Sequence, residues 1–476
     1  MSVRGTDGDG GSGTGRTGIY LLAVGLVIML AGLLFGYDQG VISGALGGIQ
    51  KSFSVGTLLL EVITSWVTLG AMAGALVAGG LADRIGRRLT IVAAALLFVA
   101  GALVESFAPG AYVLVAGRLL VGFGVGVASV AAPLYASEMA PTRLRGRMVS
   151  LYQLAITIGI FVAYFADYLL INGDRWRVML GVSAIPGVLL VVAVVPLPDS
   201  PRWYVKAGRH DAARATLVKV EPGVNIDREM ADIEETNRKE SAGSWPEVFA
   251  ARWRRPLVIG VSLAVLQQLT GINAVIYYAD KIFAAAGFSS PAGQSLATLF
   301  AIGLVNVVAT FIAVAYVDRF GRKPLLLIGS VGMGVSLVVV GAMFEVLGSS
   351  SHPAGSGTSA SGVVTLIALV VFIASFAFSL GPVVWTIINE IYPSHMRGKG
   401  VAVATAANWF AAWLVSQFFL SLVGLISEAG TFWLFAGFCA VTYIFVSRAV
   451  PETKGMSLEE VEGLWTDPGA VSGSVP

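Results

Sequence analysis

The sequence predicts an all-α membrane protein with twelve transmembrane helices, arranged as two repeats of six. Three observations carry this prediction: an apolar composition, long apolar segments and an internal repeat. Of the 476 residues, 56% are hydrophobic and only 13% are charged, which is about half the charged fraction of a typical soluble domain. A water-soluble fold this apolar would have too little polar surface, so the excess must face lipid.

Several classes of protein are excluded by the same composition. A net charge of +2 leaves no broad basic face for nucleic acid. The single cysteine, Cys439, cannot form an intramolecular disulfide and makes a thiolate metal site very improbable. The HExxH, GxSxG and Walker A motifs of common enzyme classes are absent from the sequence. We therefore expect neither an enzyme nor a bound cofactor, and we expect the chain to act as a monomer.

Apolar segments of about twenty residues, enough to cross about 30 Å of hydrocarbon, recur along the chain. They begin near Ile19, Thr57, Leu89, Tyr112, Met148, Val178, Leu257, Ser295, Pro324, Val363, Val401 and Phe432.

The remaining segments divide the chain into five parts. Residues 1–18, rich in Gly, Ser and Thr, are predicted to be a disordered tail. Residues 19–200 form the N-terminal six-helix half and residues 256–450 the C-terminal half. The polar block 201–255 between them is predicted to be a linker with short helices, and residues 451–476 a C-terminal tail.

Lysine and arginine residues cluster in alternate loops, for example at 84–88, 143–147, 319–323 and 397–399. Such loops stay in the cytoplasm. The linker and both termini are therefore predicted to be cytoplasmic, in a multi-pass protein of the cell membrane.

The chain also repeats itself, which is typical of alternating-access transporters. The sequence DRIGRR at 83–88 recurs as DRFGRK at 318–323. An acidic residue followed seven positions later by an arginine occurs twice, as Glu138 with Arg145 and as Glu390 with Arg397.

Six motifs in this order resemble the sugar porter family of the major facilitator superfamily. They are the duplicated DRxGRR/K loops, the two Glu-Arg pairs, PDSPR at 198–202, the Gln267-Gln268 helix, GPVVW at 381–385 and PETKG at 451–455. The resemblance covers Ile19 to about Thr466. It implies the major facilitator fold and transport of a sugar by alternating access.

Charged residues at the predicted inner ends of the helices have two interpretations. They are solvated ion pairs worth about 0 to 1 kcal/mol each, or a latch of ion pairs between the halves that breaks when the inner side opens. The resemblance favours the latch. The candidates are Asp83, Arg87, Arg88, Glu138, Arg145, Asp318, Arg322, Glu390 and Arg397.

Amide side chains in the apolar helices indicate a site for an uncharged ligand. Gln267, Gln268 and Asn273 lie close together in one helix, and Tyr277 follows at helical spacing. Amides both donate and accept hydrogen bonds, as sugar hydroxyls do. The alternative is that each amide simply joins neighbouring helices.

The resemblance assigns sugar contacts to seven residues and gate or wall roles to Phe35 and Tyr277. The seven are Gln153, Gln267, Gln268, Asn273, Asn306, Trp385 and Asn408. Ile160 departs from the family pattern, because some symporters of this family carry a second glutamine there. The sequence leaves open which neutral sugar is carried.

Two residues of opposite charge, Asp38 and Arg118, fall inside predicted spans. Asp38 lies in the first and Arg118 in the fourth, and a lone charge at that depth costs at least about 2.5 to 3.5 kcal/mol. We expect the two to face each other, either as a permanent ion pair or as a proton switch in which protonation of Asp38 releases Arg118.

The resemblance favours the switch, because an aspartate in the FGYD motif marks proton-coupled members. Ala184 departs from that pattern, since some bacterial symporters of the family carry a glutamate there. The sequence thus predicts a proton-coupled monosaccharide symporter. A passive uniporter and a sugar sensor without transport are the alternatives.

Overall fold

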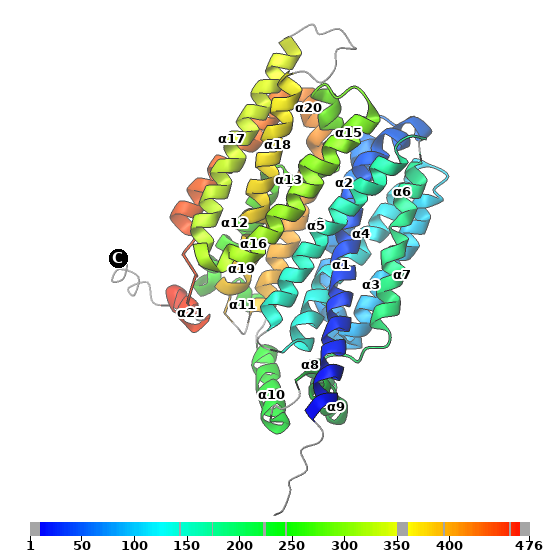
Figure 1. The fold of residues 1–476 in the computed structure, drawn as a ribbon. Helices are drawn as coiled ribbons and strands as arrows, with labels where there is room; N and C mark the ends of the chain where they lie inside the picture. Colours follow the sequence, from blue (N-terminus) through cyan, green and yellow to red (C-terminus); the bar gives the residue numbers. More distant parts are fainter. Residues whose placement is uncertain are drawn as a thin grey trace, which may run out of the picture.

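The computed structural model describes residues 10–141, 144–173, 175–221, 225–242, 245–349, 360–393, 396–456 and 458–466. These residues form a bundle of long, roughly parallel helices with a group of short helices at one end (Figure 1). Eleven helical segments in the described residues are long and apolar enough to cross a membrane. The all-α prediction is confirmed.

The N-terminal half contains six spans. They are α1 (Gly10–Phe53), α2 (Thr57–Ile85), α3 (Arg87–Ser106), α4 (Ala111–Met139), α5 (Arg145–Leu170) and a sixth span made of α6 (Trp176–Val182) and α7 (Ala184–Val194). Five of these spans begin within about three residues of their predicted starts. Helix α1 begins at Gly10, so the helical backbone includes residues 10–18 of the predicted tail. The first nine residues of that tail lie outside the described residues.

The C-terminal half uses interrupted helices. Its first span consists of α12 (Arg254–Leu269), α13 (Ile272–Tyr277) and α14 (Ala279–Ala285). The second consists of α15 (Pro291–Ala297), a π-helical segment, η3 (Thr298–Leu304), and α16 (Val305–Phe320). The third is α17 (Arg322–Ser349), and the fourth consists of α18 (Ala360–Phe378) and α19 (Leu380–Ile391). The breaks fall at Gly271 and Ser379, whose backbones are not helical, and discontinuous helices of this kind commonly form the substrate sites of transporters.

Helix α20 (Arg397–Ala449) accounts for the last two spans. Its 53 residues would extend about 80 Å as one straight helix, far more than the bilayer thickness. Ser427 interrupts it with a left-handed backbone, φ 72°. The chain turns there, so α20 supplies the eleventh and twelfth spans and the predicted twelve are accounted for.

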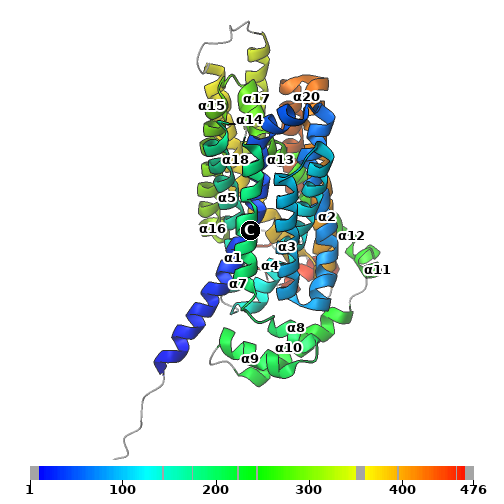
Figure 2. The ribbon, with the colours of Figure 1, turned by 90° about the vertical axis from the view of Figure 1, so that its right-hand side faces the viewer.

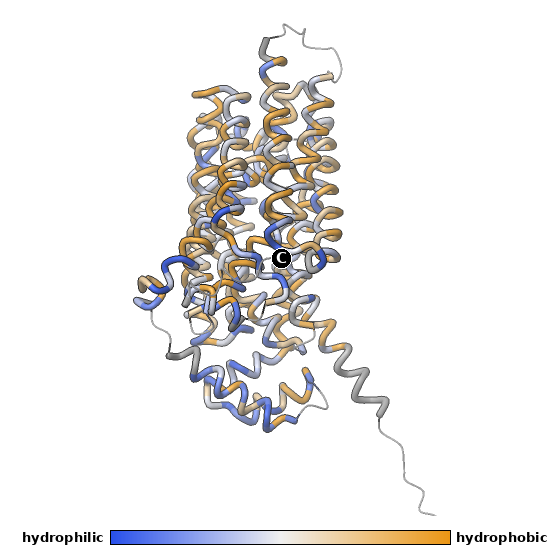
Figure 3. Tube along the Cα trace, turned by 90° about the vertical axis from the view of Figure 1, so that its left-hand side faces the viewer, coloured by the Kyte–Doolittle hydropathy of each residue, from blue (hydrophilic) through white to orange (hydrophobic). Residues whose placement is uncertain are grey.

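The linker forms short helices at one end of the bundle, as Figures 1 and 2 show. They are α8 (Pro201–Lys206), α9 (His210–Val220), α10 (Ile226–Ala242), α11 (Trp245–Val248) and the 3₁₀ turn η2 (Ala251–Trp253). A further short helix, α21 (Leu458–Thr466), follows the last span. Figure 3 shows that the linker helices are far more hydrophilic than the bundle. We call this end of the bundle the linker side.

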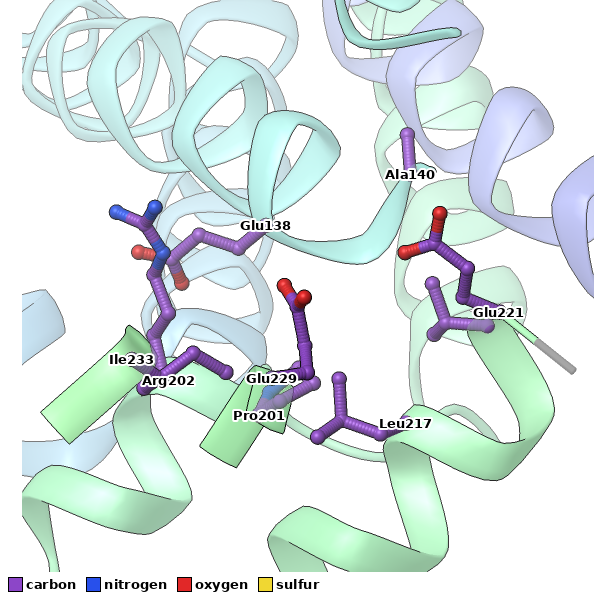
Figure 4. Close-up of a pocket in the computed structure, with 9 residues that line it drawn as sticks. Glu138, Ala140, Pro201, Arg202, Leu217, Glu221, Glu229 and Ile233 are labelled. Atoms are coloured by element: carbon purple, nitrogen blue, oxygen red, sulfur yellow. The ribbon is translucent and has the colours of Figure 1, made fainter. Parts of the chain in front are cut away.

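The linker has its own small core and docks on the bundle. Tyr204, Leu217 and Met230 pack together in it. A pocket separates α8 and α10 from the end of α4, with Glu138 and Arg202 in its wall (Figure 4).

The internal repeat is visible in the way two helices begin. The Asp199 carboxylate accepts hydrogen bonds from the backbone N–H groups of Arg87 (2.9 Å) and Arg88 (3.2 Å) at the start of α3. In the other half, Glu452 accepts from the N–H groups of Arg322 and Lys323, both at 3.0 Å, at the start of α17. The PDSPR and PETKG motifs therefore supply equivalent helix caps.

Close helix packing in the N-terminal half depends on glycine. A β-carbon on Gly36 of α1 would lie 1.9 Å from the Ile156 carbonyl oxygen of α5. One on Gly122 of α4 would lie 2.0 Å from the Val67 carbonyl oxygen of α2. These contacts bring α1 against α5 and α2 against α4 with backbones nearly touching.

The substitution Gly36→Ala is therefore expected to destabilise the protein by about 1 to 3 kcal/mol, because the rigid carbonyl of Ile156 cannot yield as a flexible side chain would. Thermal unfolding of the purified protein in detergent would show this as a lower midpoint. Gly47→Ala in the same helix is the control, since no atom lies within 4 Å of its added β-carbon. Equal midpoints for the two variants would contradict the expectation.

Candidate functional site

Asp38 and Arg118 meet inside the N-terminal half. Helix α1 presents Asp38 and α4 presents Arg118, with 2.6 Å between Asp38 Oδ1 and Arg118 NH1. Both residues are buried, at 3% and 0% exposure. Arg118 Nε also donates to the Ile63 carbonyl oxygen at 3.2 Å. The structure thus brings together the two charged residues that the sequence placed inside membrane spans. Each offsets the free-energy cost of burying the charge of the other.

A third charged residue completes this cluster, and sequence reasoning missed it. Glu105 Oε1, from the last turn of α3, lies 3.8 Å from Arg118 NH1. Its side chain is buried. A signal was available, because Glu105 is the only charged residue between positions 89 and 117. At the position where the family resemblance implies a third charge, this chain has Ala184, which is half-buried at the start of α7.

A small cavity at the junction of the two halves contains Asp38 in its wall. The lining residues are Phe35, Asp38, Gln39, Val67, Thr68, Ala71, Val125, Tyr277 and Trp409. Phe35 and Tyr277 were predicted as gate or wall residues, and both lie here. Gln39, Thr68 and Trp409 were missed, although Gln39 directly follows Asp38 in the sequence.

Aromatic rings from both halves close this cavity. The rings of Phe35 on α1 and Trp409 on α20 lie with centroids 5.5 Å apart. Tyr277 on α13 is almost completely buried and lies in the same cavity wall as Gln39. Movement of the halves would therefore change access to Asp38.

Three of the predicted amides form a hydrogen-bonded cluster, which we call the amide cluster: Gln267, Gln268 and Asn408. Asn408 Nδ2 donates to Gln267 Oε1 at 2.9 Å, and Gln268 Nε2 donates to Asn408 Oδ1 at 3.3 Å. Gln267 Nε2 donates to the Leu380 carbonyl oxygen at 2.6 Å, beside the helix break at Ser379. Gln268 Oε1 is buried without a hydrogen-bond partner in the described residues, so one acceptor remains available for a ligand.

The other four predicted contacts lie on different helices. Asn273 and Asn306 are buried on α13 and α16. Gln153 on α5 and Trp385 on α19 are half-buried. No hydrogen bond between described residues connects these four side chains to the amide cluster, so they stay predictions as sugar contacts. Ile160 is buried and packs against α1 at Gly40.

The two halves are joined at the end of the bundle away from the linker. Hydrogen bonds between described residues cross from one half to the other there, among them Ser421 N to Glu61 Oε1 at 2.7 Å, Ser65 Oγ to Gln417 Oε1 at 2.8 Å, the Tyr164 hydroxyl to the Ile276 carbonyl at 2.9 Å, and Asp280 N to Ser43 Oγ at 3.0 Å. The structure is therefore closed on the side opposite the linker.

The predicted latch residues lie on the linker side, where two acid–arginine pairs each lie within one half and Asp83 also pairs with Lys206 of linker helix α8 at 2.8 Å. Arg87 Nε lies 2.9 Å from Glu138 Oε2, and Arg322 NH2 lies 3.2 Å from Glu390 Oε1. Asp83 lies 3.3 Å from Arg87.

The remaining latch residues make other contacts or are not described. The Arg88 backbone binds Asp199, and Arg397 Nε donates to the Tyr392 carbonyl oxygen at 3.3 Å. The side chains of Arg145 and Asp318 lie outside the described residues. A latch between the halves stays a prediction.

Comparison with known proteins gives a consistent result. Residues 24–465 match the protein family described as "Sugar (and other) transporter". The chain is 41% identical over 434 residues to the galactose-proton symporter of Escherichia coli strain K12, covering 91% of this chain and 92% of that protein. It is 40% identical over 436 residues to the D-xylose transporter of Levilactobacillus brevis, covering 91% and 93%.

A solved structure matches the whole fold. The partially occluded inward-open conformation of the xylose transporter XylE from Escherichia coli has a TM-score of 0.80 and 29% identity, covering 92% of this chain and 100% of that one.

Proposed function

Because the chain belongs to the sugar transporter family, we propose that it is a proton-coupled symporter that carries a monosaccharide, a hexose or a pentose, by alternating access. The observation that carries this proposal is the position of Asp38. Its carboxylate lies in the wall of the cavity between the halves and is bound to a buried arginine. A titratable group at that point can exchange its proton with a cavity that opens to one side of the membrane at a time.

The cycle follows from the Asp38–Arg118 contact. A proton taken up from outside neutralises Asp38 and weakens its bond to Arg118. The loaded protein then turns inward, and the proton leaves Asp38 to the inside together with release of the sugar. The bond to Arg118 forms again, and the empty protein returns to the outward-facing state. One proton and one sugar cross in the same direction, and no covalent bond changes.

The sugar site is proposed at the amide cluster, extended by Gln153, Asn273, Asn306 and Trp385. Amides satisfy hydroxyl groups without requiring charge on the ligand, and Trp385 offers a flat apolar face for the C–H groups of a sugar. The relatives named for galactose and xylose support a neutral monosaccharide of five or six carbons.

The proposed orientation places the linker and both termini in the cytoplasm of a cell-membrane protein. Arginine-rich loops on the linker side support it. In that orientation the structure is closed to the outside, which fits its similarity to an inward-open transporter. The latch residues would then pair across the halves only when the cytoplasmic side closes.

Proteoliposomes containing the purified protein test the proposal. Addition of galactose or xylose outside, without an imposed gradient, is expected to raise the pH of the weakly buffered external medium as protons follow the sugar inward. A passive uniporter would move labelled sugar without any pH change. A sensor would bind sugar and move neither, and either result would contradict symport.

A further inference from the structure

Glu105 is a buried charge that the proposed cycle does not use. It is 1% exposed, and its Oε1 has no hydrogen-bond partner in the described residues. Arg118 NH2, on the guanidinium that faces it, also has no hydrogen-bond partner there. Two groups of opposite charge are thus close, at 3.8 Å between Glu105 Oε1 and Arg118 NH1, with unused hydrogen-bonding capacity on both.

The release of Arg118 from Asp38 poses a physical problem. A guanidinium cannot lose its proton in a protein, and Arg118 is fully buried. Protonation of Asp38 alone would leave this positive charge without a counterion, which is strongly unfavourable. Proton uptake at Asp38 therefore requires another anion within reach of Arg118.

We propose that Glu105 is this second partner: Arg118 pairs with Asp38 when Asp38 is ionised and with Glu105 when Asp38 carries the proton. Glu105 is a positioning residue, since it acts through Arg118 and does not line the cavity. The inference rests on the proposed function. A second anion explains how the buried Arg118 can release Asp38 and still keep a counterion.

The surroundings of Glu105 supply space and no competing cation. A β-carbon on Gly117 would lie 2.6 Å from Glu105 Cγ, so this glycine makes room for the side chain. Helix α7, which packs on α3, contains no ionisable residue. The ionisable groups on the other elements around this cluster are Arg118 on α4, Asp38 on α1, Tyr277 on α13, Arg177 on α6 and Glu61 on α2.

Two of these groups are engaged elsewhere. Arg177 donates to the Ala108 carbonyl oxygen at 3.1 Å and lies over the Trp176 ring. Glu61 is bound to Ser421. Arg118 is thus the only one of the listed cations near Glu105, and Asp38 is its rival for the same guanidinium.

The variant Glu105→Gln tests the inference, because it removes the charge and keeps the shape. Without the second partner, Arg118 stays on Asp38, so Asp38 should take up a proton only at higher proton concentration. The pH dependence of sugar-driven proton uptake in proteoliposomes is expected to shift toward acid by about one pH unit or more. Sugar exchange at equal concentrations should stay within about threefold of the unmodified rate, which also shows that the variant is folded.

Two further variants serve as a charge-retaining test and as a control for Glu105→Gln. Glu105→Asp keeps the charge but retracts it from Arg118, so a smaller acid shift is expected. Ser106→Ala removes a neighbouring hydroxyl that donates to the Arg177 carbonyl oxygen at 2.9 Å, and its pH profile should match that of the unmodified protein. If Glu105→Gln does not reach the membrane, an unshifted profile for Glu105→Asp overturns the inference.

The outcomes separate this inference from the proposed function. If the unmodified protein moves no protons with sugar, symport is wrong. If the unmodified protein couples protons to sugar and Glu105→Gln keeps the same pH profile, symport stands and the role of Glu105 is wrong.

Discussion

Asp38→Asn is expected to abolish uphill sugar accumulation and to leave exchange of internal for external sugar within about threefold. Asparagine mimics the neutral state of Asp38, so the protein can turn while loaded but carries no proton. With one-to-one coupling, an inward pH gradient of one unit drives about tenfold accumulation. The variant should reach only equal concentrations inside and outside. Labelled sugar in proteoliposomes, measured with and without the gradient, checks both parts.

Asp167→Asn is the matched control for this experiment. Asp167 is also a buried aspartate in a membrane span, but its carboxylate accepts a hydrogen bond from the Gly44 backbone at 3.2 Å and lies outside the Arg118 cluster. Its variant should still accumulate sugar. Full accumulation by Asp38→Asn would remove Asp38 from the coupling mechanism, and the permanent ion pair would then be the correct interpretation.

Gln268→Ala is expected to weaken sugar binding strongly. Gln268 Oε1 is the acceptor of the amide cluster that lacks a protein partner, and its amide nitrogen holds Asn408 in place. Loss of such a contact leaves a sugar hydroxyl unsatisfied, at a cost of about 1 to 3 kcal/mol, or roughly 5- to 150-fold in affinity. The half-saturation concentration for sugar exchange should rise by that factor.

Asn389→Ala provides the comparison for the amide cluster. Asn389 is an exposed amide on α19 whose side chain donates to the Trp385 carbonyl oxygen, four residues earlier, and to no other described residue. Its loss should change the half-saturation concentration by less than about twofold. If Gln268→Ala behaved in the same way, the amide cluster would be a structural joint between α12 and α20 and the sugar would bind elsewhere.

The spans and the repeat could be predicted from the sequence because each depends on local composition. Twenty apolar residues cross a bilayer wherever they occur, and the DRxGRR/K loops identify the duplication directly. The length of α20 shows the limit of such reasoning. Its two spans were separated correctly by hydropathy, but the backbone of Ser427 that turns the chain has no sequence signature.

The contacts of the candidate site were predictable for polar residues that are costly to bury deep in a membrane span. Asp38, Arg118 and the amides of α12 stood out because polar groups in apolar helices require partners, and the structure places partners beside them. Glu105 was missed because it lies near the end of its span, where a charge can reach water in most membrane proteins. Only the packing of α3 against α4, made close by Gly117, directs it toward Arg118.

The ion pairs on the linker side have a consequence for the speed of the transport cycle. Arg87 pairs with Glu138 and Arg322 pairs with Glu390, each within its own half. In the proposed latch, closure of this side would let each charge exchange one neighbour for another, so neither end state would leave an ion without a partner. Such an exchange would keep the two end states close in free energy, and the empty carrier would then return without an external energy source.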